Sequence, residues 1–191
     1  ETEVLSLSKL RDKKVFVTGI FANTLKDKYL KDHSIVVKNE SDTFFYNLDK
    51  SGKLNKEFLE SLFLNKDGIN DFYSQVSLDD LPYPDWGSYS KKYPLRNNFF
   101  SINEKIAIPL LGTRGCPYSC FNYCTYPLQQ GRKVRARSVE NIINEIKYWQ
   151  KELGANKFVF RDPVFSINRK HTIQFCNEVI NQKLNISFMV E

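Results

Sequence analysis

The second half of the chain alternates short apolar runs with segments whose apolar residues recur at helical spacing. The apolar runs predict three strands, at residues 106–111, 157–160 and 186–190. A helix is predicted over 139–153, with Ser138 as its cap and Gly154 as its stop. Asn168 is a suitable cap for a second helix. This order predicts an α/β fold with a parallel sheet and right-handed crossovers, although Pro109 removes one donor from the first strand.

Residues 1–64 show a shorter version of the same alternation. Apolar runs at 15–17 and 34–37 predict two strands, and the segment from Ala22 to Lys31 predicts a helix between them. Ser41 is expected to cap a further helix. We interpret this part as a small Rossmann-like α/β unit. Gly19 marks a strand-to-helix turn, but the further glycines of a dinucleotide-binding loop are missing.

Residues 65–104 separate this unit from the third part of the chain, residues 105–191. Pro82 and Pro84 disfavour both a helix and a central strand. We therefore expect an ordered linker that Trp86 anchors to a domain, and a substrate-covering loop is the alternative. The three strands of the third part do not complete a barrel, which predicts that the chain is incomplete.

Composition and charge indicate a folded protein without a membrane span. Hydrophobic residues make up 41% of the 191 residues, and no apolar run reaches ~18 residues. The acidic start is unlike a secretory signal, and four cysteines are too few for a disulfide scaffold, so we expect a reducing cytoplasm. The net charge of +6 is partly concentrated in segment 132–137. We interpret it as a solvated surface, because a nucleic-acid site would need a basic stripe with interleaved aromatic residues.

Three of the four cysteines, Cys116, Cys120 and Cys124, lie in one short segment directly after the strand predicted at 106–111. Parallel α/β folds place their chemistry at the carboxyl ends of strands. Three neighbouring thiols cannot all pair with one another, but they can all bind one metal centre. Thiolates suit zinc, copper(I) or iron–sulfur clusters.

The donor set leaves alternatives open. A structural zinc site needs a fourth ligand, for which His171 and Cys176 are candidates. A cubane cluster held by three cysteines leaves one iron open, and the nearby cations Arg114, Arg132 and Lys133 favour thiolates. Three unligated thiols are the remaining interpretation.

The segments from Gly112 to Cys120 and from Asn122 to Cys124 resemble the cluster loop of radical S-adenosylmethionine enzymes. The segments from Gln130 to Glu140 and from Leu78 to Trp86 are similar to the subgroup that has an amino-terminal cobalamin-binding domain. The resemblance covers residues 78–191 well and residues 10–50 weakly.

This resemblance implies an enzyme with the first part of a parallel (β/α) barrel of the TIM type, preceded by a remnant of a cobalamin-binding domain. It implies that Cys116, Cys120 and Cys124 hold a 4Fe–4S cluster that reductively cleaves S-adenosylmethionine to start radical chemistry. Tyr123 is then expected near the adenine, and Asp162 near the methionine amino group. Their alternatives are a half-buried loop aromatic and a turn cap. The implied partners are a small-molecule or biosynthetic-intermediate substrate and an electron donor such as flavodoxin or ferredoxin.

Two departures from the family pattern bear on these expectations. The family spacing is C-x-x-x-C-x-x-C, whereas this chain has one extra residue between Cys120 and Cys124. The family's cobalamin-binding histidine lies in D-x-H-x-x-G, which the sequence around His33 does not match. Arg161 and Glu191, at strand ends, are further candidates for polar contacts. A zinc-stabilised RNA-binding module and a degenerate, inactive relative stay open as alternatives.

Overall fold

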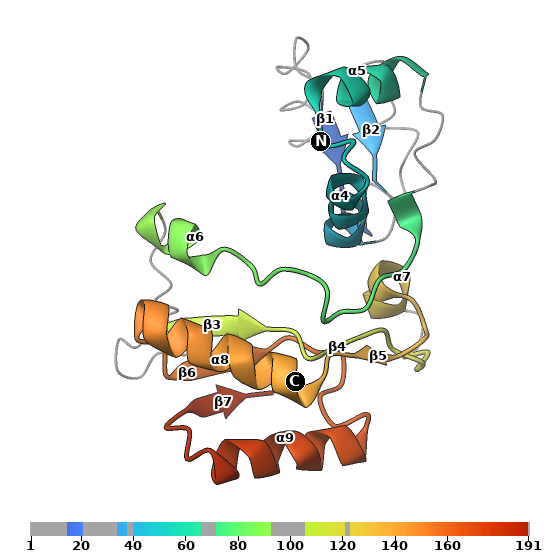
Figure 1. Cartoon of the computed structure of the whole chain (residues 1–191). Coiled ribbons are helices and arrows are strands. Elements are labelled where there is room, and N and C mark those ends of the chain that lie inside the picture. The colour runs from blue at the N-terminus through green and yellow to red at the C-terminus, as the bar shows by residue number, and fades with distance from the viewer. Residues whose placement is uncertain are drawn as a thin grey trace. The chain divides into compact units, whose positions relative to one another are not determined.

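The structure, a computed structural model, describes residues 15–20, 34–37, 40–65, 72–92, 106–120 and 123–190. The chain divides into two compact units. The first comprises residues 1–76 and 118–132, and the second comprises residues 77–117 and 133–191. Each unit combines helices with parallel strands (Figure 1), which confirms the α/β class.

The first unit is built on two short parallel strands, β1 (Val15–Val17) and β2 (Ser34–Val36). Both strands were predicted. Three helices of this unit are described: α4 (Ser41–Lys50), α5 (Lys56–Asn65) and α7 (Tyr126–Gln130). Its main core cluster consists of buried Val37, Phe44, Leu48 and Phe72.

The start of α4 differs from the prediction. Ser41 was expected to cap α4, but this prediction is wrong. The carbonyl of Glu40 accepts from the Phe44 N–H at 3.2 Å, so Glu40 is the N-cap and Ser41 is the first residue of the helix. The helix predicted from Ala22 to Lys31 lies outside the described residues.

The second unit contains a parallel sheet of order β3-β6-β7, formed by β3 (Ala107–Leu110), β6 (Lys157–Phe160) and β7 (Ser187–Met189). Helix α8 (Val139–Leu153) connects β3 to β6, and α9 (Arg169–Asn181) connects β6 to β7. The predicted strand–helix alternation is confirmed. The described strands form an open sheet, and a closed barrel is not seen among them.

The helix ends of the second unit follow the predicted capping. Ser138 Oγ accepts from the Asn141 N–H at 3.1 Å, and Asn168 Oδ1 accepts from the His171 N–H at 3.2 Å. Gly154 ends α8 in a left-handed conformation, with its N–H donated to the carbonyl of Gln150. These bonds satisfy groups that a helix leaves unpaired at its ends.

Pro109 is compatible with β3 because of its position in the ladder. The carbonyl of Leu110 accepts from Arg161 N–H on the β6 side at 2.8 Å. Neighbouring residues of a strand direct their backbone groups to opposite sides, so the Pro109 nitrogen faces away from β6. The missing donor therefore breaks no bond between β3 and β6.

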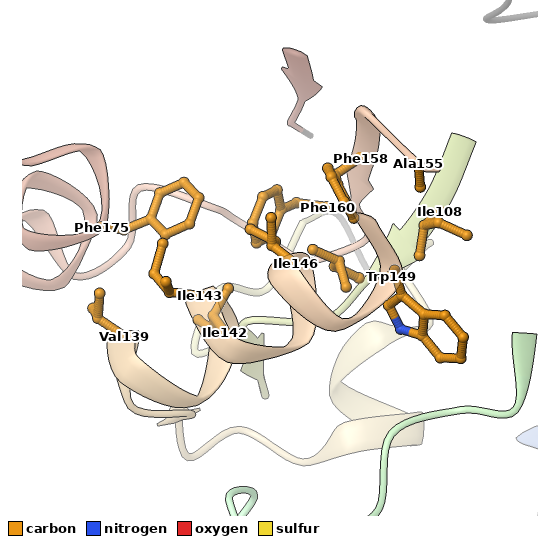
Figure 2. Close-up of a cluster of buried hydrophobic side chains, with 11 residues drawn as sticks. Ile108, Val139, Ile142, Ile143, Ile146, Trp149, Ala155, Phe158, Phe160 and Phe175 are labelled. Carbon is orange, nitrogen blue, oxygen red and sulfur yellow. The ribbon is translucent and has the colours of Figure 1, made fainter. Parts of the chain in front are cut away.

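Helices α8 and α9 pack on the sheet through one apolar core (Figure 2). In that view Ile143 and Ile146 of α8 point toward Phe175 and Phe160. The rings of Phe160 and Phe175 lie 5.2 Å apart in an edge-on arrangement. Fully burying an aliphatic or aromatic side chain stabilises a fold by about 1.5–3 kcal/mol, so this core is the main source of the unit's stability.

The linker region packs against this core. Trp86 contacts the core cluster, which confirms its predicted anchoring, and Tyr83 Oη donates to the Asn141 carbonyl at 3.3 Å. The residues around Pro82 and Pro84 are not helical, but helix α6 (Trp86–Lys92) follows directly and was not predicted. Across the described residues, no helix has both the length and the apolar character needed to span a bilayer.

A buried ion pair joins α8 to the segment that precedes it. Glu145, only 1% exposed, accepts from Arg137 Nη1 at 2.5 Å and from Trp149 Nε1 at 3.3 Å. Arg137 also donates from Nη1 to the Leu111 carbonyl at 3.1 Å and from Nε to Asn141 Oδ1 at 2.8 Å. The pair thus fixes α8 to the end of β3.

Replacing Glu145 by Ala is expected to lower the unfolding free energy of the second unit by about 3–5 kcal/mol, because Arg137 would keep a buried charge without its partner. Both tryptophans of the chain, Trp86 and Trp149, belong to this unit, so tryptophan fluorescence in urea reports on its unfolding. Glu152→Ala, at an exposed position of α8, is the matched control and should change stability by less than about 0.5 kcal/mol. Equal effects of the two substitutions would contradict the role of the ion pair.

Candidate metal centre

The segment that carries the three cysteines is closed at its base by two short paired strands, β4 (Thr113–Arg114) and β5 (Arg135–Ala136). They run antiparallel, with Thr113 opposite Ala136 and Arg114 opposite Arg135. The Arg137 N–H donates to the Gly112 carbonyl at 2.9 Å and extends this ladder. The loop therefore begins and ends beside the carboxyl end of β3, where the sequence predicted it.

Gly115 allows a close backbone contact inside this base. Its φ is +90°, and a Cβ atom built there would lie 2.1 Å from the Lys133 carbonyl oxygen. Because no side chain fits at that distance, Gly115 brings the two sides of the loop together directly before Cys116. The position of the first cysteine is thus set by backbone geometry.

All four cysteines are free thiols. Cys116 is 4% exposed and belongs to the second unit, whereas Cys120 is exposed, Cys124 is half-buried and both belong to the first unit. Within either unit, the described His, Cys, Asp and Glu side chains form no group of three that could hold a metal ion. Convergence of Cys116, Cys120 and Cys124 on one metal therefore stays a prediction.

Asp162 lies directly after β6 and is 1% exposed. Its Oδ1 accepts from the Gly112 N–H at 2.7 Å, and its Oδ2 accepts from Thr113 Oγ1 at 2.8 Å. A Cβ atom on Gly112 would lie 3.1 Å from Asp162 Oδ2, so a larger residue there would press on the carboxylate. These bonds tie the end of β6 to the start of the cysteine loop.

The surroundings of Asp162 alter its titration. Burial raises the pKa of the carboxyl above its ordinary value of 3.8, and this effect outweighs the hydrogen bonds from Gly112 and Thr113 and the charge of His171, all of which lower the pKa. The predicted contact between Asp162 and a methionine amino group stays a prediction.

The other predicted residues occupy varied positions. Tyr123 is 75% exposed, more than the half-buried ring of the alternative interpretation, and its N–H donates to the Cys120 carbonyl at 3.1 Å. Arg132 Nη1 donates to Ser119 Oγ at 3.0 Å, so this cation contacts the loop itself. Arg161 is exposed.

The two residues considered as a fourth zinc ligand lie in α9. His171 Nε2 is 2.8 Å from the Arg137 carbonyl oxygen, and Cys176 packs against the apolar core. His33 and Glu191 lie outside the described residues.

Four residues that support the site carry no recognisable signal in the sequence. They are Asp79, Thr113, Arg137 and Asn141. Arg137 was noticed only as part of the basic segment, and Asp79 only as part of the linker, although its Oδ1 accepts from the Ser138 N–H at 2.8 Å. Each acts on residues distant in sequence, so local spacing carries no sign of its role.

Comparison with curated proteins finds relatives that are enzymes. The chain is 26% identical over 178 residues to the anaerobic magnesium-protoporphyrin IX monomethyl ester cyclase of Cereibacter sphaeroides. This match covers 89% of the chain and 28% of the relative. It is 32% identical over 104 residues to the protein of the same name from Rubrivivax gelatinosus, covering 54% of the chain and 18% of the relative. The bacteriochlorophyllide d C-12(1)-methyltransferase of Chlorobaculum tepidum is 35% identical over 69 residues, covering 35% of the chain and 15% of the relative.

The chain is thus similar to enzymes named as a cyclase and a methyltransferase, in keeping with the resemblance found in its sequence. The chain spans less than a third of the length of each of these relatives. No model of a known protein family matches the chain. Among solved structures, the radical S-adenosylmethionine methyltransferase TsrM from Kitasatospora setae is 19% identical to the chain, with a TM-score of 0.38. The match covers 40% of the chain and 14% of that protein. This likeness is too limited to establish a shared fold.

Gly115→Ala is expected to destabilise the second unit more than Gly154→Ala does. Both glycines have a positive φ, but a Cβ atom at Gly154 meets nothing within 4 Å. Gly154→Ala should therefore cost only the backbone strain of about 1–2 kcal/mol, whereas Gly115→Ala adds a steric clash worth about 1–3 kcal/mol more. Urea unfolding followed by tryptophan fluorescence measures both, and similar losses would contradict the close contact at Gly115.

The raised pKa of Asp162 predicts a pH dependence that Asp162→Asn removes. The folded protein holds this proton more tightly than the unfolded chain, so the carboxyl contributes stability that is complete below about pH 3.9 and is lost as the pH rises through its folded pKa. The unfolding free energy of the wild type, relative to that of the Asn variant, should fall as the pH rises from about 4 toward neutrality. Parallel pH profiles of the two proteins would show that the pKa is not raised.

Proposed function

We propose that this chain is part of a radical S-adenosylmethionine enzyme of the cobalamin-domain subgroup, in which Cys116, Cys120 and Cys124 bind a 4Fe–4S cluster. The observation that carries this proposal is the similarity over 89% of the chain to the cyclase of Cereibacter sphaeroides. Three free thiols in a loop closed beside the carboxyl end of β3 support it.

The residues present fit such a cluster by the chemistry of their donors. Three thiols without a disulfide match a cubane that keeps one iron open. The base of the loop is fixed at Gly115, whereas the extra residue lies between Cys120 and Cys124, beyond that base. When bound, the cluster would supply the electron for reductive cleavage of S-adenosylmethionine.

The residues of the chain would position and shield this chemistry. Cys116, which is buried, would be one of the three ligands of the cluster, and the exposed ring of Tyr123 would contact the adenine. A contact of Asp162 with the methionine amino group would require its oxygens to give up their bonds to Gly112 and Thr113.

The remaining parts of the proposal concern the whole protein. Residues 1–64 would be a cobalamin-binding-like unit of Rossmann type, 65–104 a linker and 105–191 the first part of a radical S-adenosylmethionine barrel. Cobalamin would be a further cofactor, and a flavodoxin or ferredoxin in the cytoplasm would donate electrons. Some of the relatives' names specify tetrapyrroles and another specifies a cytidylyl phosphonate, and we propose a small molecule or biosynthetic intermediate as the substrate here.

Anaerobic reconstitution of the full chain with iron and sulfide tests the cluster. We expect about four irons and four sulfides per chain with broad visible absorption. A variant with Cys116, Cys120 and Cys124 replaced by Ala should lose all of these, whereas Cys176→Ala, which removes a thiol of α9, should keep them.

Two other outcomes would contradict the proposal. Tight zinc with no cluster would favour the zinc-stabilised binding module. The absence of any metal, with the chain folded, would favour the degenerate relative. Binding of S-adenosylmethionine to the reconstituted chain, measured by equilibrium dialysis, then tests the open iron.

A further inference from the structure

We infer that Asp162 is a positioning residue, which holds the backbone that leads into Cys116 and does not bind the cofactor. The inference deepens the proposed function and rests on it only for the nature of the group that Cys116 would bind. The contact between Asp162 and the cysteine loop is present in the chain itself.

The contacts of Asp162 leave little room for a ligand. Its two oxygens are engaged by consecutive residues, Oδ1 by the Gly112 N–H at 2.7 Å and Oδ2 by Thr113 Oγ1 at 2.8 Å. The residue is 1% exposed, so neither oxygen is open to solvent. The side chain of Ile142 closes on the same place, since a Cβ atom on Gly112 would lie 3.3 Å from Ile142 Cδ1. An ammonium group would have to displace these contacts to reach the carboxylate.

The same contacts fix the path of the chain toward Cys116. Thr113 is the first residue of β4, and its partner in β5 is Ala136. Gly115 then meets the Lys133 carbonyl at a distance that excludes a side chain. The segment before Cys116 is therefore held from one side by Asp162 of the sheet and from the other by the returning strand β5. Release of the first contact should let this segment, and Cys116 with it, move toward solvent.

Two substitutions separate positioning from cofactor binding. Asp162→Asn keeps an oxygen that can accept from Gly112, and its amide nitrogen can donate to the Thr113 hydroxyl, which is also an acceptor. Asp162→Ala removes both bonds. Because both variants are neutral at this position, any difference between them reports the hydrogen bonds and not the charge. Thr113→Val removes the hydroxyl while nearly conserving shape, and Thr113→Ser keeps it.

The test measures alkylation of the metal-free full chain by iodoacetamide, with each cysteine followed by mass spectrometry. Cys116 is 4% exposed and should react slowly in the wild type. We expect Asp162→Ala to accelerate its alkylation about tenfold or more and Asp162→Asn by less than about threefold. Thr113→Val should accelerate it, and Thr113→Ser should not. Cys176 in α9 is the internal control and should keep its rate in all four variants.

Three results would overturn the inference. They are an unchanged rate at Cys116 in Asp162→Ala, an equal acceleration at Cys176 that signals general unfolding, and a rate in Thr113→Val equal to that in Thr113→Ser.

Dialysis with S-adenosylmethionine after reconstitution adds a separate readout. At an iron content equal to that of the wild type, binding to Asp162→Asn should stay within about threefold of the wild type, and a loss of about tenfold or more would assign Asp162 to the ammonium group. If the wild type itself takes up no cluster, the proposed function fails while the alkylation result still decides the role of Asp162.

Discussion

Buried backbone groups need hydrogen-bond partners, and the segment after β3 meets this constraint with two residues from elsewhere in the chain. The chain leaves the sheet after Leu110, so the groups that follow have no neighbouring strand of the sheet to pair with. Asp162 accepts from the N–H of Gly112, while Arg137 donates to the carbonyls of Leu111 and Gly112. These bonds, together with the β4–β5 pairing and the close contact at Gly115, fix the start of the cysteine loop.

Each of these residues imposes requirements on the rest of the unit. The charge of Arg137 is buried and needs Glu145, which in turn bonds Trp149, so the orientation of α8 is coupled to the loop. Asn141 joins the same network and also donates from Nδ2 to the Asp79 carbonyl at 3.4 Å, which ties in the linker. The sheet, the helix α8 and the segment before the sheet are thus held together by one set of polar contacts.

The parts of the fold that could be predicted are those specified by local spacing. β3, α8, β6, α9 and β7 were visible because their apolar residues repeat at strand or helix periods and their ends carry suitable caps. Helix α6 was missed because the two prolines before Trp86 dominated the interpretation of that region, and Ser41 was misassigned because capping depends on a backbone bond at Glu40.

The candidate site could likewise be predicted only in part. The cysteines were apparent from their clustering, whereas the role of Thr113 depends on Asp162, nearly fifty residues later in the chain. Pairings of that separation depend on the folded sheet, and no short pattern encodes them. Local pattern also cannot predict whether the three thiols converge, because Cys116 belongs to one compact unit and Cys120 and Cys124 belong to the other.

Pro109 makes the two edges of the described sheet unequal in their capacity to pair with a further strand. On the β3 edge, Pro109 is one of two residues whose backbone faces outward, and it has no N–H to donate, so an approaching strand would meet an incomplete ladder. On the β7 edge, the exposed ring of Phe188 lies on a strand whose described residues include no proline. The proline ring therefore disfavours intermolecular strand pairing, the earliest step of aggregation, at the β3 edge. Any extension of this sheet, within one protein or between copies, has a preferred direction.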